Sequence, residues 1–225
     1  MSVIDGSWQW FTDSEHWSGD SGIPSRLLEH LGYTALTVGV SAAIAIPLGL
    51  WIGHTGHLRG LAVALSGALR ALPTLGVLTY VVLLSGIGLT PITVALTVLA
   101  IPPVLAGAYS GLESVDRATI DAARAMGMSE WQVLTKVEVP LALPLIVGGV
   151  RSATLQVVAT ATVAAYVGLG GLGRYIIDGI AVSDYPRTLS GSVLVVVLAL
   201  VLDGLFVLLQ KAATRSRTVT VPARP

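Results

Sequence analysis

The sequence contains no cysteine and few charged residues, and both shortages narrow the classes of protein that it can encode. Without cysteine, the chain has no disulfide and no thiolate nucleophile or metal ligand. Asp, Glu, Lys and Arg make up 12% of its 225 residues, about half of the roughly 25% that is usual in soluble domains. So few charges cannot cover the surface of a soluble domain of this length. The formal net charge is zero, which gives no electrostatic basis for a nucleic-acid partner.

The chain is instead rich in long apolar runs. Hydrophobic residues make up 53% of the chain, and its mean hydropathy is +0.79. A helix needs roughly 20 apolar residues to cross a bilayer core of about 30 Å. Five runs reach that length, and they are continuous, which favours helices over the alternating strands of a barrel. They are Leu31–Gly53, Leu58–Leu84, Leu89–Leu112, Leu141–Leu169 and Leu189–Leu209. We therefore predict an all-α, polytopic membrane bundle of about five transmembrane helices.

The second run is interrupted at Arg70–Pro73, which leaves three interpretations. It forms one crossing, a short interfacial helix followed by a span that starts near Pro73, or two spans that reverse tightly at Ala71–Pro73. One crossing is favoured, because each half of a reversing pair would be short. The N-terminus has no basic segment followed by an apolar core, so we expect no cleavable signal peptide. The sequence therefore predicts an N-terminal segment (residues 1–26), a membrane domain (27–212) with a polar loop (113–140), and a disordered tail (213–225).

Positive charges near the ends of the runs predict the orientation, because Lys and Arg gather on the cytoplasmic side of membrane proteins. The side that follows the first, third and fifth runs holds seven: Arg59, Arg117, Arg124, Lys136, Lys211, Arg215 and Arg217. The opposite side holds three: Arg26, Arg174 and Arg187. We therefore expect a multi-pass protein of the cell membrane, with its N-terminal segment outside and both the polar loop and the tail in the cytoplasm.

Tryptophans are concentrated before the first run, at Trp8, Trp10 and Trp17. Tryptophan gathers at the membrane–water interface, so an aromatic belt is the favoured interpretation. The alternative is a ligand cage built from the three rings. Aromatic residues make up only 6% of the chain, so we expect no tight aromatic cage within the membrane part either.

The polar loop between the third and fourth runs is the most informative segment. Residues 116–126 are rich in helix formers, and Gly127 is suited to end that helix. Ser129 can cap a second helix that Pro140 is expected to end. The sequence thus predicts helix–Gly–helix on the cytoplasmic side. Its expected contact surface combines small and apolar residues: Ala122, Ala123, Ala125, Met126, Met128, Trp131 and Leu134.

The spacing within this loop resembles a known family. An acidic residue and two alanines are followed by a glycine, then by two aliphatic residues and a proline; the positions are Asp121, Ala122, Ala123, Gly127, Val137, Val139 and Pro140, with Met128 after the glycine. This pattern is similar to the EAA loop of permease subunits in binding-protein-dependent ATP-binding cassette importers. The resemblance implies that the loop docks on a cytoplasmic ATPase. Asp121 stands where Glu is usual, and Val137 and Val139 replace Ile and Leu.

Other segments extend the resemblance over about residues 25–210. Those at 72–75, 86–88, 101–104 and 166–173 look like glycine betaine/choline/proline-type osmoprotectant permeases, whereas the last segment and the loop also resemble methionine-type permeases. The resemblance implies a type I importer fold and three partners: cytoplasmic ATP-binding subunits, a second permease copy or a related permease, and an extracytoplasmic substrate-binding protein. The alternatives are a permease for methionine or another small amino acid and, from a different class, a self-contained secondary transporter.

No pattern in the chain predicts catalysis, a cofactor or a metal. Asp121 and Glu130 lie on the polar loop and not in a cleft. The glycine-rich run 168–173 follows no strand and precedes no Walker lysine, so we do not expect it to bind a nucleotide. We expect it to form a tight turn instead. His54 and His57 are weak as a metal pair. We therefore predict a transport subunit that is not an enzyme, with ATP hydrolysed by a separate subunit.

Charged residues and prolines inside the runs are the remaining candidates. A charge in the bilayer is costly, so it faces a cavity, a partner or the interface. Arg70, Arg151 and Asp203 are candidates for a transport pathway or for structural pairing. Pro73 interrupts the second run. The fourth run is rich in Gly and Ala, which permits close packing, so we place it at the centre of the bundle or at an interface between subunits.

Overall fold

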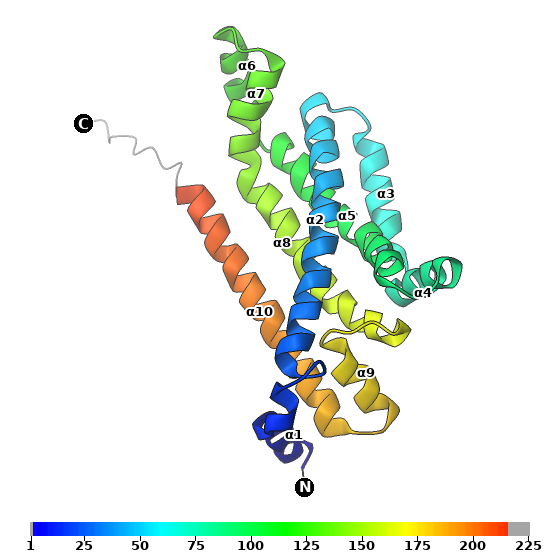
Figure 1. Cartoon of the computed structure of the whole chain (residues 1–225). Coiled ribbons are helices and arrows are strands. Elements are labelled where there is room, and N and C mark those ends of the chain that lie inside the picture. Colours follow the sequence, from blue (N-terminus) through cyan, green and yellow to red (C-terminus); the bar gives the residue numbers. More distant parts are fainter. Residues whose placement is uncertain (1, 216–225) are drawn as a thin grey trace, which may run out of the picture.

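The structure, a computed structural model, describes residues 2–215, and these form helices without any strand. In Figure 1 the long helices run between two ends of the molecule, with α1 and α9 at one end and α6 and α7 at the other. The long helices are α2 (Ile23–Thr55), α5 (Leu89–Glu113), α8 (Val139–Ala164) and α10 (Tyr185–Arg215). The shorter helices are α1 (Val3–Thr12), α3 (Arg59–Ala71), α4 (Thr74–Ser85), α6 (Arg117–Ala125), α7 (Glu130–Val133) and α9 (Gly173–Ala181). The predicted all-α membrane fold is confirmed.

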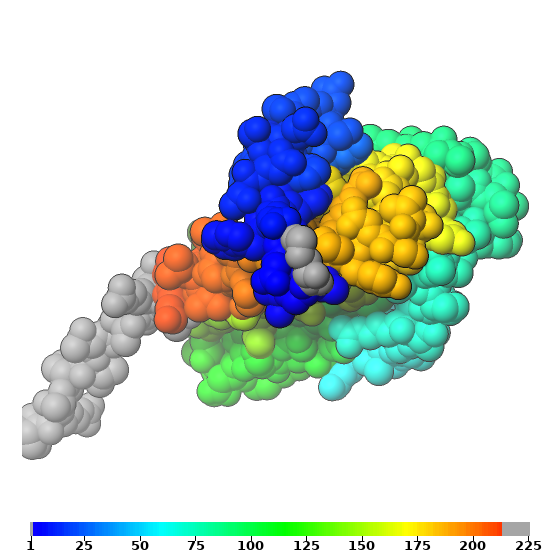
Figure 2. Space-filling view, turned by 90° about the horizontal axis from the view of Figure 1, so that it is seen from below, coloured from blue at the N-terminus to red at the C-terminus, as the bar shows by residue number. Residues whose placement is uncertain are grey.

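Helix α8 occupies the centre of the bundle, where it packs against α2, α5 and α10. Glycine allows the closest approach: a Cβ atom added to Gly107 of α5 would lie 2.6 Å from the Cα atom of Gly149 in α8. Small residues of this kind let membrane helices pack tightly. Seen from below in Figure 2, α10 and α4 lie on opposite flanks of this centre. The close packing predicted for the fourth run is thus observed, although α5 is the more buried of the two helices, with 61% of its span buried against 28%, and a role at a subunit interface remains a prediction.

The second apolar run is broken where the sequence predicts an interruption. Its two halves, α3 and α4, are bent by 87°. Leu72 between them is extended (φ −69°, ψ 133°), because a residue before proline is pushed out of the helical region. The pair therefore counts either as one broken span, which is the preferred single crossing, or as a re-entrant loop, and neither half is by itself long and apolar enough to be a span. Within residues 2–215, four helices are long and apolar enough to cross a membrane, or five crossings if this bent pair counts as one.

The first and last long helices exceed the predicted runs. Helix α2 begins at Ile23, before the predicted Leu31, because the polar groups of its first turns have partners: Arg26 Nη1 lies 2.9 Å from Glu29 Oε2. Helix α10 extends to Arg215. Three residues of the predicted tail, 213–215, are therefore helical, and residues 216–225 lie outside the part that the structure describes.

The second helix of the polar loop does not end at Pro140, as the sequence had suggested. Helix α7 continues through a π-helical turn, η2 (Leu134–Glu138), directly into α8. Together they form a continuous helical segment from Glu130 to Val167. Proline has no N–H and leaves a carbonyl of the preceding turn without its helical partner. The wider π turn absorbs this mismatch, so the chain stays helical.

The glycine-rich run 168–173 forms the expected tight turn, which closes on the start of α2. The Gly171 N–H donates a 2.7 Å hydrogen bond to Glu29 Oε2, and Gly171 has a positive φ of 82°. A Cβ atom on Gly170 would collide with the same carboxylate. The turn leads into α9, a helix that the sequence analysis did not predict.

The three N-terminal tryptophans do not form a ligand cage. Trp8 and Trp17 are exposed, whereas Trp10 is buried. The Trp10 ring stacks on His16 with 4.3 Å between centroids and meets the edge of Tyr175 at 5.0 Å. Trp10 therefore anchors α1 to α9, and the interfacial belt remains a prediction for Trp8 and Trp17.

Candidate functional site

Helix α6 in the polar loop has a strong stop signal at each end. Asp116 caps its start, where its carboxylate accepts a 3.1 Å hydrogen bond from the Ala118 N–H. At its end Gly127 has a φ of 83°. The Gly127 N–H donates to the Arg124 carbonyl at 2.9 Å, and the Met128 N–H donates to the Ala123 carbonyl at 3.3 Å. This pair of bonds is the Schellman pattern, which satisfies the last carbonyls of a helix.

Helix α7 begins at a reciprocal cap only two residues after that turn. The Ser129 hydroxyl accepts from the Gln132 N–H at 3.4 Å, and the Gln132 side chain accepts from the Ser129 N–H at 2.9 Å. This capping box fixes the direction in which α7 leaves the turn. The cap predicted at Ser129 is thereby confirmed.

One face of α6 is packed inward and is not available for contact. Ile120 and Ala123 are buried together with Val115 and Val133, and Met128 and Val137 pack against this cluster. Residues three apart share one face of a helix, which explains why Ile120 and Ala123 point the same way. The prediction that Ala123 belongs to the exposed contact surface is therefore wrong, and Met128 is half-buried.

The opposite face of α6 and the start of α7 project at the tip of the molecule (Figure 1). Its apolar members are large and open to solvent: Met126 is 76% exposed and Trp131 is 72% exposed. Ala122 and Ala125 are exposed beside them, as is the Asp121 side chain. We call these five residues the outer face. Val139 and Pro140, at the start of α8, are half-buried.

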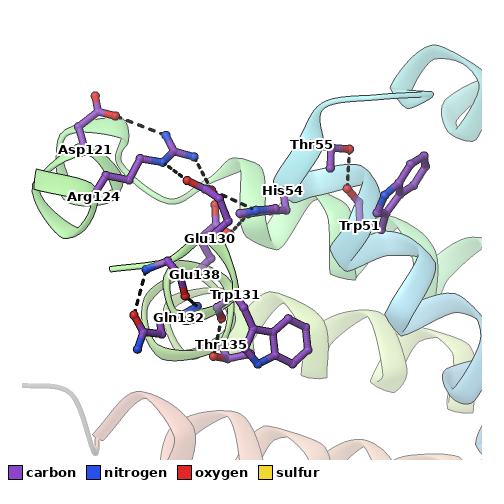
Figure 3. A network of polar contacts seen from close by, with 11 residues as sticks. Trp51, His54, Thr55, Asp121, Arg124, Glu130, Trp131, Gln132, Thr135 and Glu138 are labelled. Atoms are coloured by element: carbon purple, nitrogen blue, oxygen red, sulfur yellow. Dashed lines mark hydrogen bonds and ion pairs between the residues drawn. The ribbon is translucent and has the colours of Figure 1, made fainter. Parts of the chain in front are cut away.

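An ion network braces α6 against α7 (Figure 3). Arg124 donates two hydrogen bonds of 2.9 Å to Glu130, one to each carboxylate oxygen. A weaker contact of 3.6 Å joins Arg124 to Asp121. The hydrogen bond to Glu130 holds the pKa of the Arg124 guanidinium above its usual value. Because this pair is exposed, it orients the two helices more than it stabilises them.

His54, at the end of α2, connects this loop to the membrane domain. Its Nε2 atom lies 3.3 Å from Glu130 Oε2, and its Nδ1 atom makes a short contact with Glu138 Oε2. The Glu138 side chain is only 3% exposed. Figure 3 shows the imidazole between the two carboxylates. From the sequence, His54 is a candidate only for a weak metal pair, and Glu138 does not stand out, since no local pattern links residues 84 positions apart.

The candidate charges within the membrane have two different surroundings. Arg151 of α8 pairs with Asp203 of α10 through contacts of 2.7 and 2.9 Å, and its Nη1 donates to Gln210 Oε1 at 3.2 Å. The structural pairing considered for Arg151 and Asp203 is therefore what the structure contains. Arg70, by contrast, is exposed at the end of α3, one turn before the α4 start at Thr74 that Pro73 precedes.

Comparisons with known proteins agree with this architecture. The family described as the inner membrane component of binding-protein-dependent transport systems matches residues 45–215. A glycine betaine/carnitine/choline transport system permease protein of Bacillus subtilis is 30% identical over 83% of this chain and 86% of its own length. An osmoprotectant import permease protein of Salmonella typhimurium is 32% identical over 90% of this chain and 97% of its own length. An inward-facing structure of the MetNI methionine ABC transporter has a TM-score of 0.76 at 24% identity, covering 86% of this chain and 96% of that chain.

Proposed function

Because this chain belongs to the family of inner membrane components of binding-protein-dependent transport systems, we propose that it carries osmoprotectants across the membrane. It is the permease of an ATP-binding cassette importer, and its multi-pass helical fold is that of such permeases. The substrates that we propose are small quaternary ammonium compounds such as glycine betaine, carnitine and choline. The printed names of the two relatives support this class. The likeness to a methionine transporter concerns the fold alone.

The outer face is the observation that carries the proposed mechanism. Trp131, Met126, Ala122 and Ala125 are all exposed on this loop, and exposed apolar side chains outside the membrane are typical of a protein contact site. We assign it to docking of a cytoplasmic ATP-binding subunit, which hydrolyses the ATP. The residues of the motif then have separate tasks: Asp121 and Ala122 face the partner, Gly127 sets the turn, and Ala123 and Val137 hold the loop together.

The continuous helix from Glu130 to Val167 supports a direct route for motion. Its 38 residues correspond to a rod of about 55 Å, longer than the bilayer core. A push on the outer face enters this rod at Glu130 and reaches the interior of the bundle along one continuous helical segment. His54 passes the same displacement to α2. Rigid-body tilting of α2 and α8 is then a means of alternating access.

The remaining partners and the orientation follow from the same assignment. The end that carries α6 is cytoplasmic, and the end that carries α1 and α9 faces a substrate-binding protein outside the cell membrane. Residues 1–26 form most of that outer surface, residues 27–212 form the membrane domain, and the loop 113–140 is the cytoplasmic connection. A second permease, identical or related, completes the transport path.

Reconstituted transport tests this proposal. The permease is placed in vesicles with its ATP-binding subunit, its binding protein is added outside, and uptake of labelled glycine betaine, carnitine, choline and methionine is measured with and without ATP. We expect ATP-dependent uptake of at least one quaternary ammonium compound and none of methionine. Uptake of methionine alone would overturn the substrate class. Uptake driven by an ion gradient without the ATP-binding subunit would overturn the mechanism.

A further inference from the structure

A pocket of about 410 Å³ opens at the break between α3 and α4. It is lined by Leu69, Arg70, Leu72, Thr74, Leu99, Ser152 and Gln156. Its volume lies within the roughly 300–1,000 Å³ that small-molecule sites occupy. We propose that this pocket is a pathway site in which Arg70 binds the carboxylate of a transported zwitterion. The inference rests on the proposed function and narrows its substrates to those that carry a carboxylate.

The depth of Arg70 is the first argument. Helix α3 starts at Arg59, whose Nε atom lies 3.1 Å from Glu113 Oε1 near the end of α5. Arg70 follows eleven positions later (59 to 70), a rise of about 16 Å, which is half of a bilayer core of about 30 Å. A charge at that depth is costly against lipid and marks a cavity or a partner.

Arg70 lacks the protein partner that the other deep arginine has. Arg151 is neutralised by both oxygens of Asp203. Among residues 2–215, no carboxylate forms an ion pair with Arg70, which is exposed and lines the pocket. An arginine presents a planar fork of N–H donors that matches a carboxylate. The partner that we propose for Arg70 is therefore the carboxylate of a ligand and not a side chain of this chain.

The rest of the lining suits the same ligand. Thr74 and Ser152 add hydroxyl groups, and Thr74 opens α4, whose first turn has no side-chain cap. The positive end of a broken membrane helix commonly faces the anionic group of a substrate. Gln156 donates to the Leu99 carbonyl at 2.9 Å, the carbonyl that Pro103 leaves without its helical partner. The floor of the pocket is thus held in place by a bond that crosses from α8 to α5.

The lining contains no aromatic ring, so it offers no cation–π surface for a quaternary ammonium group. Discrimination at this site therefore acts on the carboxylate end of the substrate. Glycine betaine and carnitine have that end, whereas choline carries only the cation and a hydroxyl group. A guanidinium in the path attracts the first two and repels the third.

The experiment compares substrates in the reconstituted transporter. Arg70→Gln should lower ATP-dependent uptake of glycine betaine and carnitine at least about tenfold and leave choline uptake unchanged or raised. Arg70→Lys should recover part of the loss, because it restores a charge without the bidentate fork. Arg59→Gln is the matched control on the same helix, and it should change the uptake of all substrates by the same factor.

The outcomes separate this inference from the proposed function. If the unaltered transporter imports none of the three compounds, the proposed function fails. If it imports them and Arg70→Gln lowers all three equally or none of them, the role of Arg70 as a carboxylate site is refuted while the proposed function stands. Import of choline alone by the unaltered transporter also refutes it.

Discussion

The polar loop with α8 and the bent pair α3–α4 are built in opposite ways. The first is fixed by two caps, a buried apolar cluster and charged contacts, and it continues as one helix to Val167. The second is broken by 87° at Pro73, and it buries only Ala62, Leu78 and Val82. A segment that receives force from a partner benefits from being continuous. A segment that lines a transport pocket needs a break, because the break is what exposes polar groups inside the membrane.

The largest effect on this contrast is expected when the contact between His54 of α2 and Glu138 is removed. Glu138→Gln removes a buried carboxylate that contacts His54, and leaving a buried polar group without its partner costs about 1–3 kcal/mol. We expect a lower thermal midpoint in detergent and a loss of transport larger than that of any other loop variant. Thermal unfolding and uptake are measured together.

The double variant His54→Gln with Glu138→Gln is the control. Replacing both residues leaves neither a buried carboxylate nor an imidazole without its partner, so much of the stability should return. If the double variant is as unstable as the sum of both single variants, the two side chains are not coupled.

The next largest effect is expected at the turn between α6 and α7. Gly127 has a φ of 83°, and a Cβ atom there would meet nothing within 4 Å. Gly127→Val therefore acts through backbone strain alone, about 1–2 kcal/mol, and should turn the outer face away from its partner. Insertion into the membrane should persist while ATP hydrolysis no longer drives uptake.

Gly127→Asn is the matched control, because Asn tolerates the left-handed conformation. It should retain most of the transport. Full coupled transport by Gly127→Val would show that the shape of this turn does not matter for the ATPase connection.

These two sites also show how far the sequence could be used to predict the structure. Gly127, Ser129 and Asp116 act through hydrogen bonds within a few residues, so their roles were predictable. His54 and Glu138 meet only because α2 and α8 pack, which no local pattern records. Pro140 was misjudged for a related reason: a proline signals a helix end, but here the π turn keeps the helix continuous.

The same distinction applies to the membrane part. The break at Pro73 was predictable because proline restricts its neighbour, whereas the angle between α3 and α4 depends on how each helix packs against α5. The pairing of Arg151 with Asp203 was one of two alternatives, and only the tertiary arrangement decides between them. The burial of Ala123 follows from the direction of the α6 inner face, which the alanine pattern alone does not set.

Ala122 and Ala123 are neighbours in the sequence, and substituting each of them tests whether α6 has an inner and an outer face. Ala123 is 3% exposed, so Ala123→Leu overpacks the cluster and should destabilise the loop by about 1–3 kcal/mol. Ala122→Leu on the outer face should leave the thermal midpoint unchanged but weaken capture of the ATP-binding subunit. Unfolding and co-purification of that subunit separate the two effects. Equal loss of stability in both variants would contradict the assignment of an inner and an outer face.

The smallest effect is expected for the exposed pair of Arg124 and Glu130. Both side chains are solvated, and screening weakens such a pair. Arg124→Gln should therefore leave the thermal midpoint within measurement error and reduce coupled uptake only slightly, with the difference from the unaltered protein shrinking as salt is raised. A large loss that persists at high salt would mean that Arg124 contacts the ATP-binding subunit itself. In that case the bracing of α6 against α7 would rest on the buried cluster alone.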